Sequence, residues 1–314
     1  MHWADRIGRR LKLRDLHILL AVVQCGSMAK AAGQLSVSNP VVSKAIADLE
    51  HVLGVRLLDR GPHGVEPTIY GRALLDRGLS AFDELKQAVN HIEFLADPTA
   101  GEVRIGSSIA IASSLIAAVV DRLFQRHPRL VFNLVAAESA LTYRALEERK
   151  VDLVVARIFR PVAEEQMNAE LLYDEQDIVV AGAQNPWTRR RKVKLADLMN
   201  EAWVLPPPDS LSGSLIGEAF RASGLDFPKA TVLCSTVPVR NALLATGRFL
   251  TIIPNFVLAF SSSDNPSLKR LPVDLPTTSR PVGILTLKKR TLSPAAQLFI
   301  DHARQVAKAL ARRS

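Results

Sequence analysis

The sequence predicts an all-α N-terminal unit with a small hairpin, then a long helix, then an α/β domain over residues 98–314. Two observations carry this fold class. Apolar residues recur at helical spacing, i, i+3, i+4 and i+7, through most of residues 13–95. From residue 102 onward, short β-branched runs alternate with helical stretches, which is typical of α/β sheets.

The composition fits a globular protein of about two domains, since 48% of the 314 residues are hydrophobic. No apolar run approaches the roughly 20 residues that a membrane-spanning helix needs. The N-terminus, MHWADRIGRRLK, has no apolar signal core, so we expect a cytoplasmic protein without a membrane partner. Cys25 and Cys234 match no metal or redox spacing, and we expect neither a metal site nor a cofactor.

The formal net charge of +9 suggests a polyanionic partner. Its distribution weakens this argument, because residues 1–70 hold nine basic and six acidic residues and carry only +3. Much of the remainder lies in runs, such as 189–192, that are usually solvated surface. A local pattern, rather than the total charge, has to identify a nucleic-acid site.

Residues 13–37 predict two short helices and a turn. An apolar stripe indicates a first helix over Leu13–Gln24. Gly26 ends it, and Ser27 is a suitable N-cap for a second helix whose alanines allow close packing. Ser36 and Val37 then form a turn. The spacing therefore predicts two helices that cross.

A third helix is predicted from Ser38, with Pro40 in its first turn, where the missing N–H costs nothing. Gly54 ends this helix. Its apolar residues follow steps of four, three and four, and its opposite face is small and polar. These apolar residues are Val42, Ile46, Leu49 and Leu53. Two short helices, a tight turn and such a third helix describe a helix-turn-helix.

The small polar face suits a DNA major groove, which is about 12 Å wide. Asn39 offers a donor and an acceptor to a base edge, and Ser43 can do either. Lys44 can reach a guanine or a phosphate, and the helix amides at this end point toward phosphate. An ordinary three-helix packing unit is the alternative, because helix-turn-helix geometry also occurs without DNA.

Residues 55–69 predict a β-hairpin wing, because two apolar stretches flank the turn-rich DRGPHG. Its Arg60, His63 and Thr68 would lie along a phosphate backbone, although His63 fits a plain solvated loop equally well. The unit over residues 1–70 thus supplies nine candidate DNA-binding residues: Ser27, Lys30, Ser38, Asn39, Pro40, Ser43, Lys44, Arg60 and Thr68.

A helix predicted over residues 71–97 carries a heptad-like apolar seam. A long helix beside a small domain has little of its own chain to pack against, so a partner helix is the simplest use of the seam and we expect a dimer. A core helix of a single domain is the alternative. The candidate dimer residues are Leu75, Leu79, Phe82, Leu85, Val89 and Ile92, and the spacing continues to Leu95.

These features together resemble the N-terminal domain of LysR-type transcriptional regulators over about sixty positions, a far more specific match than a lone motif. The resemblance implies a winged helix-turn-helix on an interrupted inverted-repeat promoter site in double-stranded DNA. It also implies a dimer, often paired into a tetramer, and leaves a contact with RNA polymerase open. Asn39 stands where the family usually has glutamine, and Met28 replaces a common aromatic residue. The matching residues are Leu16–Val23, Gly26, Ser27, Ala31, Ala32, Leu35, Val37, Ser38, Pro40, Ser43, Ile46, Leu49, Glu50, Leu53, Gly54, Leu57, Arg60, Thr68 and Gly71.

After a hinge-like linker at 97–101, strand and helix patterns alternate and predict parallel sheets. The predicted strands are Glu102–Gly106, Val131–Ala136, Val151–Ala156, Ile178–Ala183, Trp203–Leu205, Thr231–Cys234 and Leu250–Ile253. The predicted helices are Ile109–Arg126, Leu141–Arg149, Ser214–Ala222, Val239–Ala245 and Pro294–Ala311.

In open parallel sheets, ligands bind beyond the carboxyl ends of the strands, at helix N-termini. Polar loops at these positions supply hydroxyls, N–H groups and arginines that suit a small polar effector, an anionic one included. For each serine taken alone, a helix N-cap is the alternative. The candidate effector-binding residues are Ser107, Ser108, Ser139, Arg157, Ser210 and Thr236.

The second half also resembles the effector domain of LysR-type regulators, which is a two-lobed α/β domain similar to type II periplasmic binding proteins. The resemblance implies a domain over 98–314, with lobe I at about 98–175 and 278–314 and lobe II at about 176–277. Stretches such as VEPTIYGRALLDRG and RNALLATGRFLTIIP resemble the galactose-binding-protein-regulator subgroup, which does not identify the ligand.

The expected function is therefore sequence-specific transcription regulation under the control of a small-molecule effector bound between two lobes. The sequence opposes three other functions. An enzyme is opposed by the absence of a Gly-rich phosphate loop, a Ser elbow or a metal-spaced His/Cys set. A solute-binding protein is opposed by the helix-turn-helix, and a non-specific architectural DNA binder by the modest charge of residues 1–70.

Overall fold

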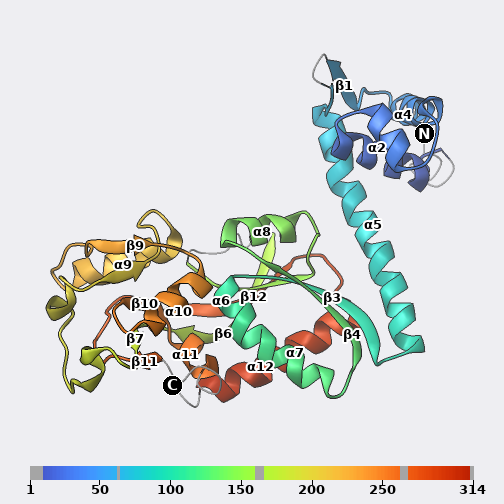
Figure 1. Ribbon diagram of the computed structural model, residues 1–314. Coiled ribbons are helices and arrows are strands. Elements are labelled where there is room, and N and C mark those ends of the chain that lie inside the picture. The colour runs from blue at the N-terminus through green and yellow to red at the C-terminus, as the bar shows by residue number, and fades with distance from the viewer. Residues whose placement is uncertain (1–9, 62–63, 160–165, 262–267, 312–314) are drawn as a thin grey trace. The chain divides into compact units, whose positions relative to one another are not determined.

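The computed structural model describes residues 10–61, 64–159, 166–261 and 268–311 (Figure 1). The chain divides into two compact units, Met1–Lys86 and Gln87–Ser314, termed the first and the second unit. Each unit has its own hydrophobic core.

Among the described residues that precede the hairpin, three helices follow one another, as the apolar stripes predict. α2 (Leu13–Cys25) ends at Gly26, which has a positive φ of 64°. α3 (Met28–Gln34) and α4 (Asn39–Leu53) follow it, and Gly54 ends α4 at a φ of 72°. Their shared core includes Leu16, Leu19, Val22, Ala31, Val42, Ile46 and Leu49. The three predicted helices are thereby confirmed.

The hairpin of the first unit consists of β1 (Leu58–Gly61) and β2 (Gly64–Pro67), paired antiparallel. Its second strand is tied to the turn after α2, because the Val65 N–H donates to the Gly26 carbonyl at 3.0 Å. On α4, the Glu50 carboxylate accepts the two backbone N–H groups at the start of β1, at 2.8 and 3.3 Å. The wing is therefore tied to the turn after α2 and to α4.

Helix α5 (Ile69–Ala96) has 28 residues and is therefore about 42 Å long. The Thr68 hydroxyl caps its start, accepting from the Gly71 N–H at 3.1 Å and donating to the Arg56 carbonyl at 2.8 Å. No side chain fits at Gly71, since a Cβ there would lie 2.1 Å from the Leu57 carbonyl oxygen. The start of α5 is thus fixed against the segment that precedes the hairpin.

The second unit holds two five-stranded sheets, and the elements around each are called lobe I and lobe II (Figure 1). Lobe I contains β3 (Ala100–Ser107), α6 (Ile109–Ile111), a π-helical turn η1 (Ala112–Ile116), α7 (Ala117–Phe124), β4 (Arg129–Ala136), α8 (Ser139–Glu147), β5 (Leu153–Arg157), β6 (Met167–Glu175), β12 (Arg280–Leu287) and α12 (Pro294–Ala311). Lobe II contains β7 (Asp177–Gly182), η2 (Pro186–Arg189), η3 (Leu195–Leu198), β8 (Trp203–Leu205), α9 (Leu211–Ala222), β9 (Ala230–Leu233), α10 (Val237–Ala245), β10 (Leu250–Pro254), α11 (Asn255–Ser261) and β11 (Leu268–Arg270).

The two sheets share one topology, with strand orders β4-β3-β5-β12-β6 and β11-β7-β10-β8-β9. Each contains one antiparallel strand, β12 in lobe I and β7 in lobe II. The predicted parallel pairing is confirmed within β4-β3-β5 and within β10-β8-β9, and it is wrong for β12 and β7, which run antiparallel to their neighbours. Two parallel strands that are neighbours in one sheet need a crossover connection between them, usually a helix. No such connection separates β6 from β7, because β7 begins one residue after β6 ends and belongs to the other sheet.

The chain passes between the lobes twice, between β6 and β7 and again between β11 and β12. One hydrophobic cluster includes side chains of both lobes, such as Ile105 and Leu115 of lobe I and Phe256 and Val257 of lobe II. A second cluster around Trp203 belongs to lobe II. The lobes therefore share part of their core near the crossings.

No single helix among the described residues is both long and apolar enough to cross a membrane. The pair α2 and α3, bent by 115°, passes the same test of length and composition taken together. Its apolar side chains form the core of the first unit.

Candidate DNA interface and ligand site

Helix α4 presents a polar tip to solvent. Asn39 and Pro40 open the helix and are exposed, and Lys44 one turn later is also exposed. Ser43 is half-buried beside them. Residues three and four apart share a helix face, so these four side chains lie together while Val42, Ala45, Ile46 and Leu49 face the core.

Ser27 and Ser38 occupy the N-cap positions of α3 and α4, as their sequence context predicts. The expected side-chain capping bonds are absent at both of these described serines, because neither hydroxyl accepts an N–H of its helix. Ser38 is exposed and Ser27 is half-buried. Both helix ends therefore keep hydroxyl and amide groups that a phosphate can accept from.

Three of the candidate DNA-binding residues are exposed cations: Lys30 on α3, Lys44 on α4 and Arg60 on β1. None of them makes an ion pair or a side-chain hydrogen bond with another described residue. Thr68 differs, because its hydroxyl both donates and accepts within its own chain. His63 lies outside the described residues.

The seam on α5 divides into two halves. Leu75 is buried in the core of the first unit, and Phe82 packs against the same core with its ring 5.8 Å from that of His17. Leu79 is half-buried. The C-terminal half is exposed instead, at 48% for Leu85, 53% for Val89, 66% for Ile92 and 71% for Leu95. The exposed half is the part available to a partner.

The six candidate effector residues all lie at the carboxyl ends of parallel strands or in the segments that follow them. In lobe I, strand register places Ser107 beside Ala136 and Val155, so the segments after β3, β4 and β5 meet at one edge. Ser108 and Ser139 follow β3 and β4, and Arg157 is the last residue of β5. In lobe II, Ser210 and Thr236 follow β8 and β9. The structure thus brings four together in lobe I and two in lobe II.

Most of these side chains are engaged within their own chain. The Ser108 and Ser210 hydroxyls cap α6 and α9, accepting from Ile111 at 3.4 Å and from Gly213 at 3.1 Å. The buried Ser107 hydroxyl donates to the Ser108 carbonyl. No described residue bonds the Ser139 or Thr236 hydroxyl.

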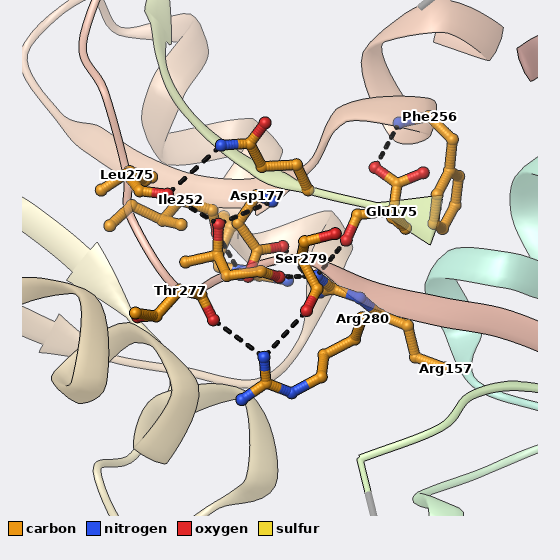
Figure 2. Close-up of polar contacts among 12 residues, drawn as sticks. Arg157, Glu175, Asp177, Ile252, Phe256, Leu275, Thr277, Ser279 and Arg280 are labelled. Atoms are coloured by element: carbon orange, nitrogen blue, oxygen red, sulfur yellow. Dashed lines mark hydrogen bonds and ion pairs between the residues drawn. The ribbon is translucent and has the colours of Figure 1, made fainter. Parts of the chain in front are cut away.

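Arg157 ties the two chain crossings together, as Figure 2 shows. Its buried guanidinium donates to Asp177 Oδ1 at 2.7 Å, to the Glu175 carbonyl at 3.0 Å and to the Thr278 carbonyl at 2.7 Å. Glu175 and Asp177 lie at the first crossing and Thr278 at the second. Arg157 thus bonds residues of both chain crossings, while its predicted contact with the effector stays a prediction.

Glu175, which carried no recognisable sequence signal, lies beside Arg157 in Figure 2. Its Oε1 accepts the Phe256 N–H at the start of α11, at 3.1 Å. Burial raises the pKa of Glu175 to about 7, against opposing contributions from the Phe256 N–H and from Arg157. Burial also raises the pKa of Tyr173, which packs edge-on against Phe256.

Arg240, in the first turn of α10, is a second residue that the sequence analysis missed. It is 9% exposed, and its closest acceptor is the Ile252 carbonyl, at 3.4 Å from Nη1. Its position four residues after Thr236 was the signal that could have found it, because that spacing places both on one helix face.

A separate cavity of about 330 Å³ lies in lobe I and at the end of α5. It contains none of the six candidates, and is lined by Asn90, Glu93, Phe94, Gly101, Glu102, Arg129, Val131, Ser293 and Ala295. Among the described residues, no three His, Cys, Asp or Glu side chains are grouped so as to hold a metal ion.

Comparison with protein families gives two matches. A model of the "bacterial regulatory helix-turn-helix protein, lysR family" matches residues 13–72, and a model of the "LysR substrate binding domain" matches residues 96–308. The second alone covers more than half of the chain. The chain belongs to the LysR family.

Individual LysR proteins match along nearly the whole chain. The HTH-type transcriptional regulator GbpR of Azospirillum brasilense is 28% identical, over 97% of this chain and 89% of its own. A full-length OxyR variant from Pseudomonas aeruginosa is 18% identical and covers 93% of this chain and 97% of its own, with a TM-score of 0.67. Full-length CbnR, solved with its target DNA, is 21% identical over 94% and 100%, with a TM-score of 0.62. The two structures show a shared fold.

The protein is thus a LysR-family DNA-binding transcriptional regulator with an effector-binding domain. This confirms the family and the fold class that the sequence predicts, a winged helix-turn-helix, a long helix and an α/β effector domain.

Proposed function

We propose that this regulator binds an inverted-repeat promoter site in double-stranded DNA through one α4 helix from each subunit of a dimer. The observation that carries the proposal is the exposed tip of α4, where amide, hydroxyl and ammonium groups gather with no ion-pair partner among the described residues. In this assignment Asn39, Ser43 and Lys44 contact base edges or phosphates.

The remaining candidates position the protein on the backbone, which fixes register without carrying sequence information. Their roles follow from exposure and unused hydrogen-bonding groups. Arg60 and Lys30 neutralise phosphates, the Ser27 and Ser38 hydroxyls bond them, and Pro40 keeps the tip narrow. Thr68 acts indirectly, by holding α5 to the wing.

The proposed organisation assigns residues 1–70 to DNA binding, 71–97 to the dimer helix and 98–314 to effector binding. The exposed half of the α5 seam supports a dimer, which pairs further into a tetramer. The division of the strands into two sheets supports the proposed lobe I, at about 98–175 and 278–314, and lobe II, at about 176–277. A small polar effector between the lobes alters their geometry and thereby the spacing of the α4 helices.

We further propose that the protein acts in the cytoplasm and catalyses no reaction. The relatives that match are transcriptional regulators, which supports a regulatory role without chemistry. RNA polymerase is a proposed partner at the promoter.

The proposal is tested with two substitutions at the α4 tip, measured by fluorescence anisotropy on a promoter fragment over a range of salt. Asn39→Ala is expected to relax preference at one base position, worth about 1–3 kcal/mol. Lys44→Ala is expected to weaken binding, and to lower the salt slope by about one if it contacts a phosphate.

Lys86→Ala is the matched control, because it also removes one exposed positive charge from the first unit, but on α5. If both α4 variants bind the fragment as tightly and selectively as the control at moderate salt, α4 is not the recognition helix.

A further inference from the structure

Arg240 is a buried cation with little compensation. Arg240 is nine-tenths buried, and its Nε has no hydrogen-bond partner in the described part of the chain. Its Nη1 donates to the Ile252 carbonyl at the long distance of 3.4 Å. It forms no ion pair within 4.0 Å with any described carboxylate. Burial lowers the pKa of Arg240, although Cys234 and Asp177 oppose this.

The nearby carboxylates are already engaged. The Asp177 carboxylate interacts electrostatically with Arg240 but forms an ion pair with Arg157 at 2.7 Å. The Glu175 carboxylate accepts the Phe256 N–H at 3.1 Å. Arg157 and Arg240 both keep an Nε without a partner among described residues. Asp177 is therefore paired with Arg157, and it acts on Arg240 only through a longer-range charge interaction. A buried charge left in this way is unfavourable unless an opposite charge joins it.

The surroundings of Arg240 suit an anion. It lies at the carboxyl edge of the parallel strands β9, β8 and β10, where ligands of open α/β sheets bind. Thr236, one turn earlier on α10, is exposed and its hydroxyl is unbonded by described residues. The N-terminus of a helix adds unpaired amides and a partial positive charge, although Pro238 contributes no N–H.

We propose that Arg240, together with Thr236 and the amino end of α10, binds an oxyanion group of the effector: a carboxylate, phosphate or sulfate. This rests on the proposed effector-binding function and names the chemical class of the ligand. The free protein then contains an uncompensated buried charge that the effector neutralises, so ligand binding and stability are linked through this one residue.

The test measures the melting temperature, Tm, of the full-length protein and of Arg240→Met. Succinate, phosphate and sulfate are titrated in parallel at constant ionic strength against chloride, with galactose as a neutral comparator. Arg240→Lys keeps the charge without the planar fork, and Arg248→Met removes an exposed positive charge at the other end of α10. Binding of every variant to a promoter fragment is measured separately.

Without oxyanions, Arg240→Met is expected to melt at the wild-type Tm or above it, because an apolar side chain replaces an unpaired charge. At least one oxyanion raises the wild-type Tm, and the anion that does so identifies the group. Its apparent affinity falls about tenfold or more in Arg240→Met, less in Arg240→Lys, and is unchanged in Arg248→Met.

Three results would overturn the assignment: a Tm several degrees lower in Arg240→Met, an equal oxyanion response in Arg240→Met and the wild type, or no oxyanion response in the wild type. The measurement of promoter binding distinguishes a failure of the Arg240 assignment from a failure of the proposed regulator function. A wild type that binds no promoter DNA refutes the regulator function, whereas normal DNA binding with any of the three results refutes Arg240 alone.

Discussion

The exposed half of the α5 seam gives the most direct quantitative prediction, which concerns Ile92→Ser. Ile92 is 66% exposed and shares its stripe with Leu85, Val89 and Leu95. Complete burial of an isoleucine side chain is worth about 1.5–3 kcal/mol, so burying the exposed two-thirds in a dimer contributes roughly 1–2 kcal/mol per subunit. Both subunits lose this contribution, and the dimer therefore loses roughly 2–4 kcal/mol.

At about 1.4 kcal/mol per tenfold, this loss raises the dimer dissociation constant roughly 30- to 700-fold. Sedimentation velocity over a dilution series measures the constant directly. The neighbouring exposed residue supplies the control, since His91→Ser lies off the stripe and is expected to dimerise as the wild type does. Phe82 is a poor choice for the test because it packs against the core of its own unit.

The reasoning is refuted if Ile92→Ser keeps the wild-type dissociation constant, or if His91→Ser weakens the dimer equally. The first result would mean that the seam does not face a partner, and the second that the stripe has been assigned to the wrong face.

Two further predictions concern the effector domain. The pKa of Glu175 is raised from 4.5 to about 7, so the folded state binds more protons than the unfolded state in that interval, and the stability present below pH 4.5 is lost as the pH rises through 7. Glu175→Gln, whose amide carbonyl can still accept the Phe256 N–H, is expected to flatten this part of the Tm–pH profile, and an unchanged profile would assign the dependence to another group. Ser210→Ala is expected to destabilise the protein by about 1 kcal/mol through the lost α9 cap, with oxyanion affinity unaffected in the same Tm titrations; a selective loss of affinity would make the hydroxyl a ligand contact.

The first unit was predictable almost residue by residue because its signals are local. Gly26 and Gly54 end helices in the left-handed conformation that favours glycine, and Pro40 starts a helix where its missing N–H is harmless. Such preferences depend on a few adjacent residues. The seam on α5 was also visible as a period, but the period could not show that Leu75 is buried by its own unit.

The mixed direction of the sheets was not predictable in the same way. β12 lies between β5 and β6, more than a hundred residues away along the chain from each, and no local pattern specifies that pairing. β6 was missed because it is an edge strand whose exposed and buried positions do not alternate cleanly.

The ligand site was only partly predictable for a related reason. Strand ends and helix starts predicted that polar residues gather at the carboxyl edge of each sheet, and the structure places the six candidate residues at those edges. Which guanidinium lacks an ion-pair partner depends on residues distant in sequence: Arg157 bonds a residue 121 positions later, while Arg240 pairs with no carboxylate in the described part of the chain. Sequence spacing favoured Arg157, and the contacts favour Arg240.

The hydrogen bonds that Arg157 makes to both chain crossings have a mechanical consequence. Two polypeptide connections between rigid bodies would ordinarily allow bending about one axis and also twisting, as each connection moves independently. Because a single guanidinium bonds the backbone of both connections, a displacement of one is transmitted to the other. We therefore expect the lobes to move along a restricted path, so that effectors of different shapes would produce a similar movement with different amplitude.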